Sequence, residues 1–229
     1  MALQWELLTI LLGDAVYEVT RALAPQHATA AFRNAKLITN LEPPGMGAFE
    51  GWLGHVVNSH HPLALAMGYY YAFFHLTVTG AVLIWMWWRR PAAYARARAV
   101  LFTLTFGALL VFWVFPVAPP RLAVPGTVDT LSLALLGGTQ TATAGAAAQV
   151  ASSGVSGLVN PYAAFPSLHV AWAAWCAWAV WSQLDSRRRW LVWLYPIATM
   201  TVVVGTANHY ILDVLAGLVT LAIAIAIVG

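Results

Sequence analysis

The sequence predicts an all-α membrane protein in which six transmembrane helices form a single bundle. Three observations lead to this fold class. Hydrophobic residues make up 61% of the 229-residue chain, charged residues make up 8%, and the mean hydropathy is +0.72. This composition lies outside the range of soluble globular domains. Apolar runs of membrane-spanning length recur along the chain, and clusters of arginine separate some of them.

Six apolar runs are the expected spanning helices, and we treat residues 1–229 as one membrane-embedded domain. The first run is the weakest, because it carries Glu6, Asp14 and Glu18 together with Arg21. The second run is strong, and the sixth is almost free of charge after its first turn. In chain order, the expected spans are residues 3–23, 63–88, 99–115, 168–184, 190–204 and 209–228.

Two connections are long and differ from the spans in composition. Residues 25–62 contain proline, glycine and polar residues, and we expect short interfacial helices there. Residues 116–166 begin with a proline-rich stretch, and their middle, GGTQTATAGAAAQVASSGVSG, is a low-complexity run of small residues.

Arginine clusters predict the orientation in the membrane. One cluster lies between the second and third runs, at Arg89, Arg90, Arg96 and Arg98, and the other is 187–189. The positive-inside rule puts both connections, and therefore both termini, in the cytoplasm. Residues 25–62, residues 116–166 and the turn before the sixth run are then extracytoplasmic.

The positions of the arginines between apolar runs also explain the net charge of +3, so nucleic acid is not an expected partner. The sequence gives no prediction of oligomeric state.

Polar residues from distant parts of the chain are expected at this extracytoplasmic face. Arg121 follows the third run in FPVAPPRL. Ser167 and His169 open the fourth run in NPYAAFPSLHVAW, and His209 and Asp213 open the sixth in NHYILDVLAG. Because all three elements end on one side, these side chains should meet at one membrane depth. Ionisable residues at such positions are candidates for a functional site.

The spacing of these residues has a chemical meaning. His209 and Asp213, at i and i+4 of a helix, would share one face, so the carboxylate can bind one imidazole nitrogen and leave the other as a nucleophile. His169 can give a proton to a leaving oxygen. The free N–H groups at the helix start near Ser167, together with the planar Arg121 guanidinium, suit a phosphate. The set predicts phosphoryl transfer, although Ser167 can also be a simple helix cap and Arg121 an interfacial anchor.

At these residues the sequence resembles the type 2 phosphatidic acid phosphatase superfamily. PSLH, which ends at His169, is similar to the family's second motif, usually PSGH, and the H-x-x-x-D of His209 and Asp213 is similar to the end of its third. PSLH, APPR and NHYxLD together resemble the branch that contains the inositol phosphorylceramide synthases. The resemblance implies that His209 is the phosphorylated nucleophile, Asp213 its orienting partner and His169 the general acid. It also implies that no metal or other cofactor is needed.

Two positions differ from the family pattern. Val114 stands where the first motif has a lysine, and Val203 stands where the third motif has an arginine. Phosphate charge must then be met by helix termini or by other polar side chains. The expected candidates are Thr206, Asn208, Arg33 and Lys36.

A further histidine lies inside the second run, in YYYAFFH. His75 is either a buried hydrogen-bonded residue or, with Tyr70 and Tyr71, part of the lining of a lipid pocket. The outer connections hold four more histidines, but without the close spacing of a metal site, so no metal ligands are expected. These are His27, His55, His60 and His61.

The sequence therefore predicts an enzyme that cleaves a phosphate ester or anhydride at the outer membrane face through a phosphohistidine. If water accepts the phosphoryl group, it is a lipid phosphatase for phosphatidate or a polyprenyl phosphate or diphosphate. If an alcohol accepts it, it is a phosphotransferase of the inositol phosphorylceramide synthase type. A different class also stays open, a non-catalytic lipid-binding or scramblase-like protein. In each case the expected partners are a phosphorylated lipid and the bilayer itself.

Overall fold

The computed structural model describes residues 27–130 and 160–229, with positions 4, 11–13, 15, 16 and 19. Regular structure in these residues is helical; beyond the helices, Val117 and Ala163 form an isolated parallel bridge. The predicted all-α class is confirmed for this part of the chain. Most of the first expected span and the low-complexity middle of 116–166 lie outside the described residues.

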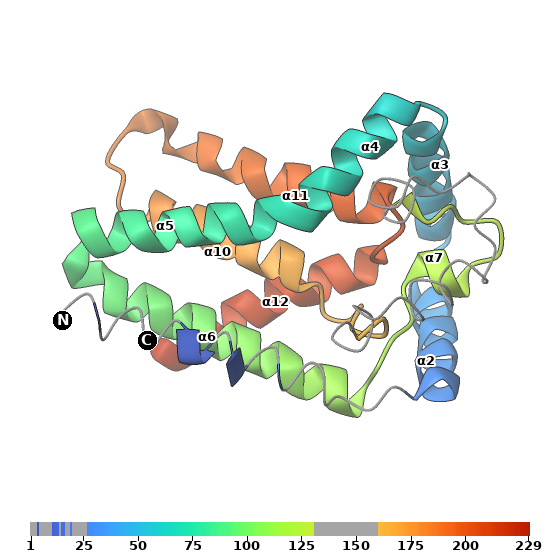
Figure 1. Cartoon of the computed structure of the whole chain (residues 1–229), viewed down its shortest axis with the longest axis horizontal. Helices are drawn as coiled ribbons and strands as arrows, with labels where there is room; N and C mark the ends of the chain where they lie inside the picture. The colour runs from blue at the N-terminus through green and yellow to red at the C-terminus, as the bar shows by residue number, and fades with distance from the viewer. Residues whose placement is uncertain (1–3, 5–10, 14, 17–18, 20–26, 131–159) are drawn as a thin grey trace.

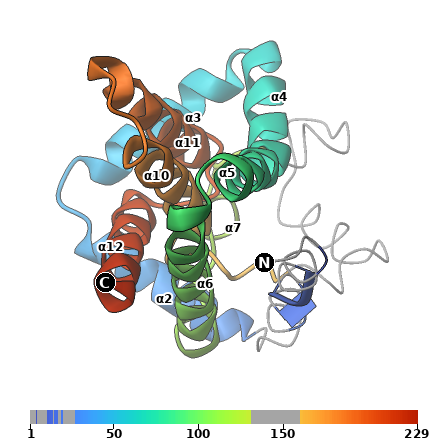
Figure 2. The same ribbon diagram turned by 90° about the vertical axis from the view of Figure 1, so that its left-hand side faces the viewer.

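Five helices run along the long axis of the molecule (Figure 1). They are α5 (His75–Arg89), α6 (Pro91–Val114), α10 (Leu168–Trp181), α11 (Leu194–Gly205) and α12 (Ile211–Val228). The end-on view in Figure 2 shows α10 among the others, and α10 contacts α5, α6, α11 and α12. Its buried residues are mainly alanine, with Trp175 and Cys176. Small side chains let neighbouring helices approach closely, as is common in membrane bundles.

Short helices cover one end of this bundle. Helices α2 (Ala28–Leu41) and α3 (Met46–Asn58) lie across the end in Figure 1. Helix α4 (His61–Tyr69) continues through a π-helical turn, η1 (Tyr70–Phe74), into α5. The buried face of α2, which includes Ala31, Ala35 and Ile38, belongs to the same core cluster as Val117, Ala164 and Tyr210. Residues 27–62 thus contain two complete short helices, as expected, and these lie against the ends of the bundle helices.

Three described helices are long and apolar enough to cross a membrane. These are the continuous helix His61–Arg89, Pro91–Val114 and Ile211–Val228. Helix α10 has 14 residues, and α11 has 12 after a 3-10 segment, η3 (Arg187–Trp193). Both are shorter than the roughly 20 residues that span a bilayer. Apolar helices of this kind indicate a membrane protein, while the number of six spans stays a prediction.

The start of α6 corrects one expectation. Helix α6 begins at Pro91, a favoured first position, so Arg96 and Arg98 lie within its first eight residues and not in a loop. Their guanidinium groups lie over aromatic rings, Arg96 over Trp178 and Arg98 over Tyr94.

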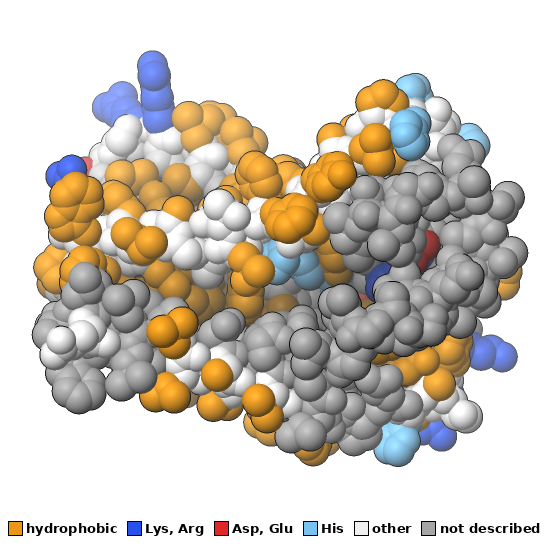
Figure 3. Space-filling view, in the orientation of Figure 1, with side chains coloured by type: hydrophobic (Ala, Val, Ile, Leu, Met, Phe, Trp, Pro, Cys, Tyr) orange, Lys and Arg blue, Asp and Glu red, His pale blue; other side chains and the backbone are white. Residues whose placement is uncertain are grey.

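In Figure 3, Lys and Arg side chains project near the two ends of the long axis, and the described surface between them is largely hydrophobic. That distribution suits a bundle that crosses a membrane along its long axis.

Candidate active site

Backbone hydrogen bonds tie together the end of α6, the start of α10 and the start of α12. Val117 N–H donates to Tyr162 O at 2.8 Å, and Ala164 N–H donates to Val117 O at 3.3 Å. Ser167 N–H donates to Asp213 O at 2.9 Å. Three segments distant in sequence are therefore fixed against one another at the end of the bundle that α2 and α3 cover. The candidate site residues lie at this junction.

His209 is buried at the junction, with 3% of its surface exposed. Its Nδ1 atom lies 2.8 Å from the Ala164 carbonyl oxygen and 3.4 Å from Asp213 Oδ2. Both neighbours are acceptors, so the Nδ1 proton is retained and Nε2 carries the lone pair. Nε2 is buried and has no hydrogen-bond partner among the described residues. The lone pair of this buried nitrogen is therefore not used by any described residue.

The contact between His209 and Asp213 has a different origin from the one expected. Helix α12 begins at Ile211 with Tyr210 as its N-cap, so His209 precedes the helix and the two residues do not share a helix face. Asp213 is the third helical residue, and its Oδ2 accepts the Tyr210 N–H at 2.9 Å. A carboxylate that caps its own helix start naturally faces the residue before the cap. Asp213 therefore has two roles, because it stabilises the start of α12 and also contacts His209.

His169, which is on the first turn of α10, lies beside His209. Its ring centroid is 5.8 Å from that of His209 and 4.3 Å from that of His75. Tyr71 stacks on the His169 ring at 4.1 Å with an interplanar angle of 21°. His169 Nε2 has no hydrogen-bond partner within the described part of the chain. Figure 3 shows histidine side chains in a recess near the middle of one face, between hydrophobic side chains.

Tyr70 and Tyr71, the first two residues of the π-helical turn, contact different neighbours. Tyr71 stacks on His169, whereas Tyr70 turns to α11, where its hydroxyl lies 2.9 Å from the Thr199 hydroxyl. The structure thus places Tyr70 away from the site and Tyr71 in it, while His75 lies beside His169 as part of the cluster. Tyr71 and His75 are four residues apart, which was a usable signal in the sequence. Wide turns of this type occur often at functional sites.

Arg121 lies on the short helix α7 (Pro120–Ala123) and points to the segment before His209. Its backbone N–H donates to Ala207 O at 2.9 Å, and its Nη1 donates to Asn208 Oδ1. Its Nε lies 3.7 Å from Asp129 Oδ2. Asn208 in turn donates from Nδ2 to Thr206 Oγ1 at 2.8 Å. The arginine is therefore held in place by an amide beside the candidate nucleophile.

The other expected phosphate contacts are arranged differently. The Thr206 hydroxyl donates to Val202 O at 2.7 Å, and Asn208 uses its amide on Thr206 and Arg121, so both residues support Arg121. Arg33 and Lys36 are exposed on α2, away from its buried face, so the idea that they fold into the site is wrong for this structure. An amphipathic helix that packs its apolar side inward directs its charges outward.

Ser167 is fully buried and acts as the N-cap of α10. Its Oγ accepts a hydrogen bond from the Val170 N–H at 3.5 Å, as the side chain of a helix N-cap does. Helix α12 comes very close at this point, because a Cβ atom on Gly217 would lie 2.5 Å from the Ser167 carbonyl oxygen. The glycine allows the starts of α10 and α12 to approach, which brings His169 and His209 together.

Two carboxylates of the α2–α3 region, which no sequence pattern singled out, also contact the start of α12. Glu50, on α3, accepts the Ile211 N–H at 2.6 Å, and Glu42, the C-cap of α2, accepts the Leu212 N–H at 3.4 Å. Burial raises the pKa of Glu50 to about 8, and the charge of Glu42 contributes in the same direction. The signal in the sequence was weak, since it consisted of two acidic residues in a segment with few charges.

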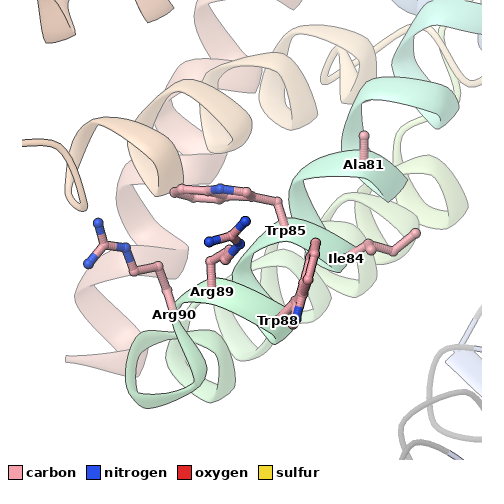
Figure 4. Close-up of a pocket in the computed structure, with 6 residues that line it drawn as sticks. All are labelled: Ala81, Ile84, Trp85, Trp88, Arg89 and Arg90. Carbon is pink, nitrogen blue, oxygen red and sulfur yellow. The ribbon is translucent and has the colours of Figure 1, made fainter.

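A separate groove lies at the other end of α5. It has a volume of about 740 Å³ and is lined by Ala81, Ile84, Trp85, Trp88, Arg89 and Arg90 (Figure 4). The Arg89 guanidinium lies 4.5 Å from the centre of the Trp88 ring. The lining offers neither a nucleophile nor a general acid, so the groove is distinct from the candidate active site.

Comparison with known proteins gives one match. The family model described as the PAP2 superfamily matches residues 37–227. No curated protein and no solved structure matches the chain. The matched range contains His169, Arg121, His209 and Asp213, as well as both carboxylates at the start of α12.

Proposed function

The chain belongs to the PAP2 superfamily, and from this membership and the site geometry we propose that it is an integral membrane lipid phosphatase that works through a phosphohistidine. Members of this superfamily are generally phosphatases or phosphotransferases. The observation that carries the proposal is the state of His209. Acceptors on its Nδ1 side leave Nε2 as a buried nitrogen with a free lone pair.

In the first half of the proposed reaction, His209 Nε2 attacks the phosphorus atom of the substrate. A P–N bond forms while the P–O bond to the lipid oxygen breaks, and His169 gives a proton to that oxygen. The ring separation of 5.8 Å is short enough for both imidazoles to contact one phosphoryl group. Arg121 and the N-terminus of α10 offset the negative charge of the phosphate. Asp213 and the Ala164 carbonyl stabilise the imidazole as it becomes positively charged.

In the second half, an acceptor oxygen attacks the phosphohistidine and the P–N bond breaks. His169, now neutral, takes the proton of the acceptor, and His209 is restored. With water the products are free phosphate and a lipid alcohol or a shorter phosphate. With an alcohol the same steps transfer the phospho group, as in the inositol phosphorylceramide synthase branch that PSLH and NHYxLD resemble. We propose the phosphatase and keep the transferase as the alternative acceptor.

The test is phosphate release by the purified protein in detergent, without added metal, from phosphatidate and from polyprenyl phosphate and diphosphate. We expect release from at least one of these lipids and inhibition by vanadate, which resembles the transition state of phosphoryl transfer. Loss of substrate only when a polyol or lipid alcohol is added would identify the transferase. Lipid binding with neither release nor transfer, on every substrate, would contradict the proposal and favour a non-catalytic member of the fold.

We further propose that residues 1–229 form one membrane-embedded domain with cytoplasmic termini and an extracytoplasmic active site. The arginine clusters at Arg89 and Arg187 lie at the end of the bundle opposite the histidines, which supports this orientation. A cysteine at the exposed Ser59 should react with an impermeant thiol reagent in intact cells, and one at the exposed Ser186 should react only after lysis. The native Cys176 is buried and gives a low background. The reverse labelling pattern would place the site in the cytoplasm.

A further inference from the structure

The first turn of α12 is attached to the outer helices by two carboxylates. Ile211 N–H donates to Glu50 Oε1, and Leu212 N–H donates to Glu42 Oε1, at 2.6 and 3.4 Å. The first N–H groups of a helix have no acceptor within the helix, and here side chains from α3 and from the end of α2 supply it. His209 lies two residues before this turn. The position of the candidate nucleophile therefore depends on contacts far away in sequence.

Three carboxylates meet at this helix start, because Asp213 accepts the Tyr210 N–H beside them. Burial is the main reason that the pKa of Glu50 is raised to about 8, and the hydrogen bond from Ile211 opposes it. Glu42 raises it further through its charge and through a hydrogen bond with Glu50, and Asp213 adds a smaller effect of the same sign. The positive end of a helix favours negative charge, but burial and mutual repulsion outweigh that preference here. Tyr210 faces the same three carboxylates.

We propose that Glu42 and Glu50 share one proton and act as a positioning pair, which holds the start of α12 and therefore His209 in place. A carboxylic acid beside a carboxylate can donate to it, while each group still accepts a backbone N–H. The shared proton removes the repulsion between the two side chains. Both are positioning residues, because the structure shows their contacts to the backbone of α12 and not to the imidazole. The effect on turnover rests on the proposed function, whereas the effect on the helix does not.

The sign of the pH dependence follows from the pKa of Glu50. This pKa is raised from an ordinary value of 4.5 to about 8, so the folded protein binds the proton more tightly than the unfolded chain. The stabilisation from the proton is complete below pH 4.5 and is lost as the pH rises through about 8. Above that pH the pair becomes two neighbouring anions, and the hold on α12 weakens.

Glu50→Gln tests the proposal, because the amide keeps an oxygen for the Ile211 N–H and can donate to Glu42 without titrating. In detergent, we expect the melting temperature of the wild type to fall from pH 5 to pH 9 more steeply than that of Glu50→Gln. Hydrogen exchange of peptides covering residues 209–214 should stay protected in Glu50→Gln and become roughly tenfold faster in Glu50→Ala, which leaves the Ile211 N–H without its acceptor. Asp185→Asn, at an exposed carboxylate, should match the wild type in both measurements.

Equal pH slopes of melting in the wild type and Glu50→Gln, or unchanged exchange in Glu50→Ala, would overturn the proposal. Both measurements are independent of turnover, so they decide the proposal even if no substrate is cleaved. Where phosphate release is observed, Glu50→Gln should keep wild-type kcat near pH 6.5 and lose the fall in kcat above pH 8. Persistence of that fall in Glu50→Gln would also contradict a role for the shared proton.

Discussion

His209→Ala should abolish phosphate release, with a loss of roughly four powers of ten or more, and should form no covalent phosphoenzyme. The reason is that Nε2 of His209 is the buried nitrogen with a free lone pair, held by acceptors on its Nδ1 side. His169→Ala removes only the proposed acid, so it should still form the intermediate from a phosphate ester with a good leaving group. The measurement is trapping of an acid-labile, alkali-stable phosphoprotein in each variant.

The matched control for this experiment is His55→Ala, since His55 is an exposed histidine on α3. It should keep wild-type turnover and labelling. Melting curves of all three variants separate loss of chemistry from loss of folding. A label that persists in His209→Ala would show that another residue is the nucleophile, and the histidine next to it, His169, would be the first to test.

Arg121→Lys should lower kcat/KM by about 10- to 1000-fold, because a lysine ammonium cannot reproduce a planar guanidinium that binds Asn208 and a phosphate at once. Asn208 accepts from Arg121 Nη1 and is itself fixed by Thr206, so the guanidinium is oriented before a substrate arrives. Turnover and vanadate inhibition should weaken together, since both depend on the same anion site. Kinetic assays at several vanadate concentrations measure both.

Arg33→Lys is the matched control, as Arg33 is exposed on α2. It should leave kcat/KM and vanadate inhibition at wild-type values. Full activity in Arg121→Ala would show that helix termini hold the phosphate without the guanidinium, and that the contact of Arg121 with Asn208 is structural.

The elements that carry the site were predictable because the polar residues stand at the ends of strongly apolar runs. His169, His209 and Asp213 each follow a polar turn that interrupts such a run, so a bundle must bring them to one end. The structure places them there, together with Arg121. The roles of these residues in catalysis remain predictions for the experiments above.

Other parts of the site depend on packing that a single sequence does not reveal. The π-helical turn at Tyr70 is not predicted by any residue pattern in YYYAFFH, although the four-residue spacing of Tyr71 and His75 was a usable signal for Tyr71. Glu42 and Glu50 matter because α2 and α3 pack across the start of α12, and the approach of two amphipathic helices to a third is a tertiary effect. His209 was expected inside a helix because the apolar run begins beside it, whereas Tyr210 is the cap.

The π-helical turn between α4 and α5 has a consequence for how the sequence of this protein can vary. A π turn holds about one residue more than an α turn, so the helix before it is out of phase with the helix after it by about 100°. Tyr70, the first residue of this turn, contacts Thr199 of α11, while Tyr71, next to it, stacks on His169. The packing of α4 against its neighbours is then separate from the packing of α5 against the histidine cluster, although α4 and α5 belong to one continuous helix. Substitutions in α4 that change its fit to α3 can accumulate without turning His75 away from the histidine cluster.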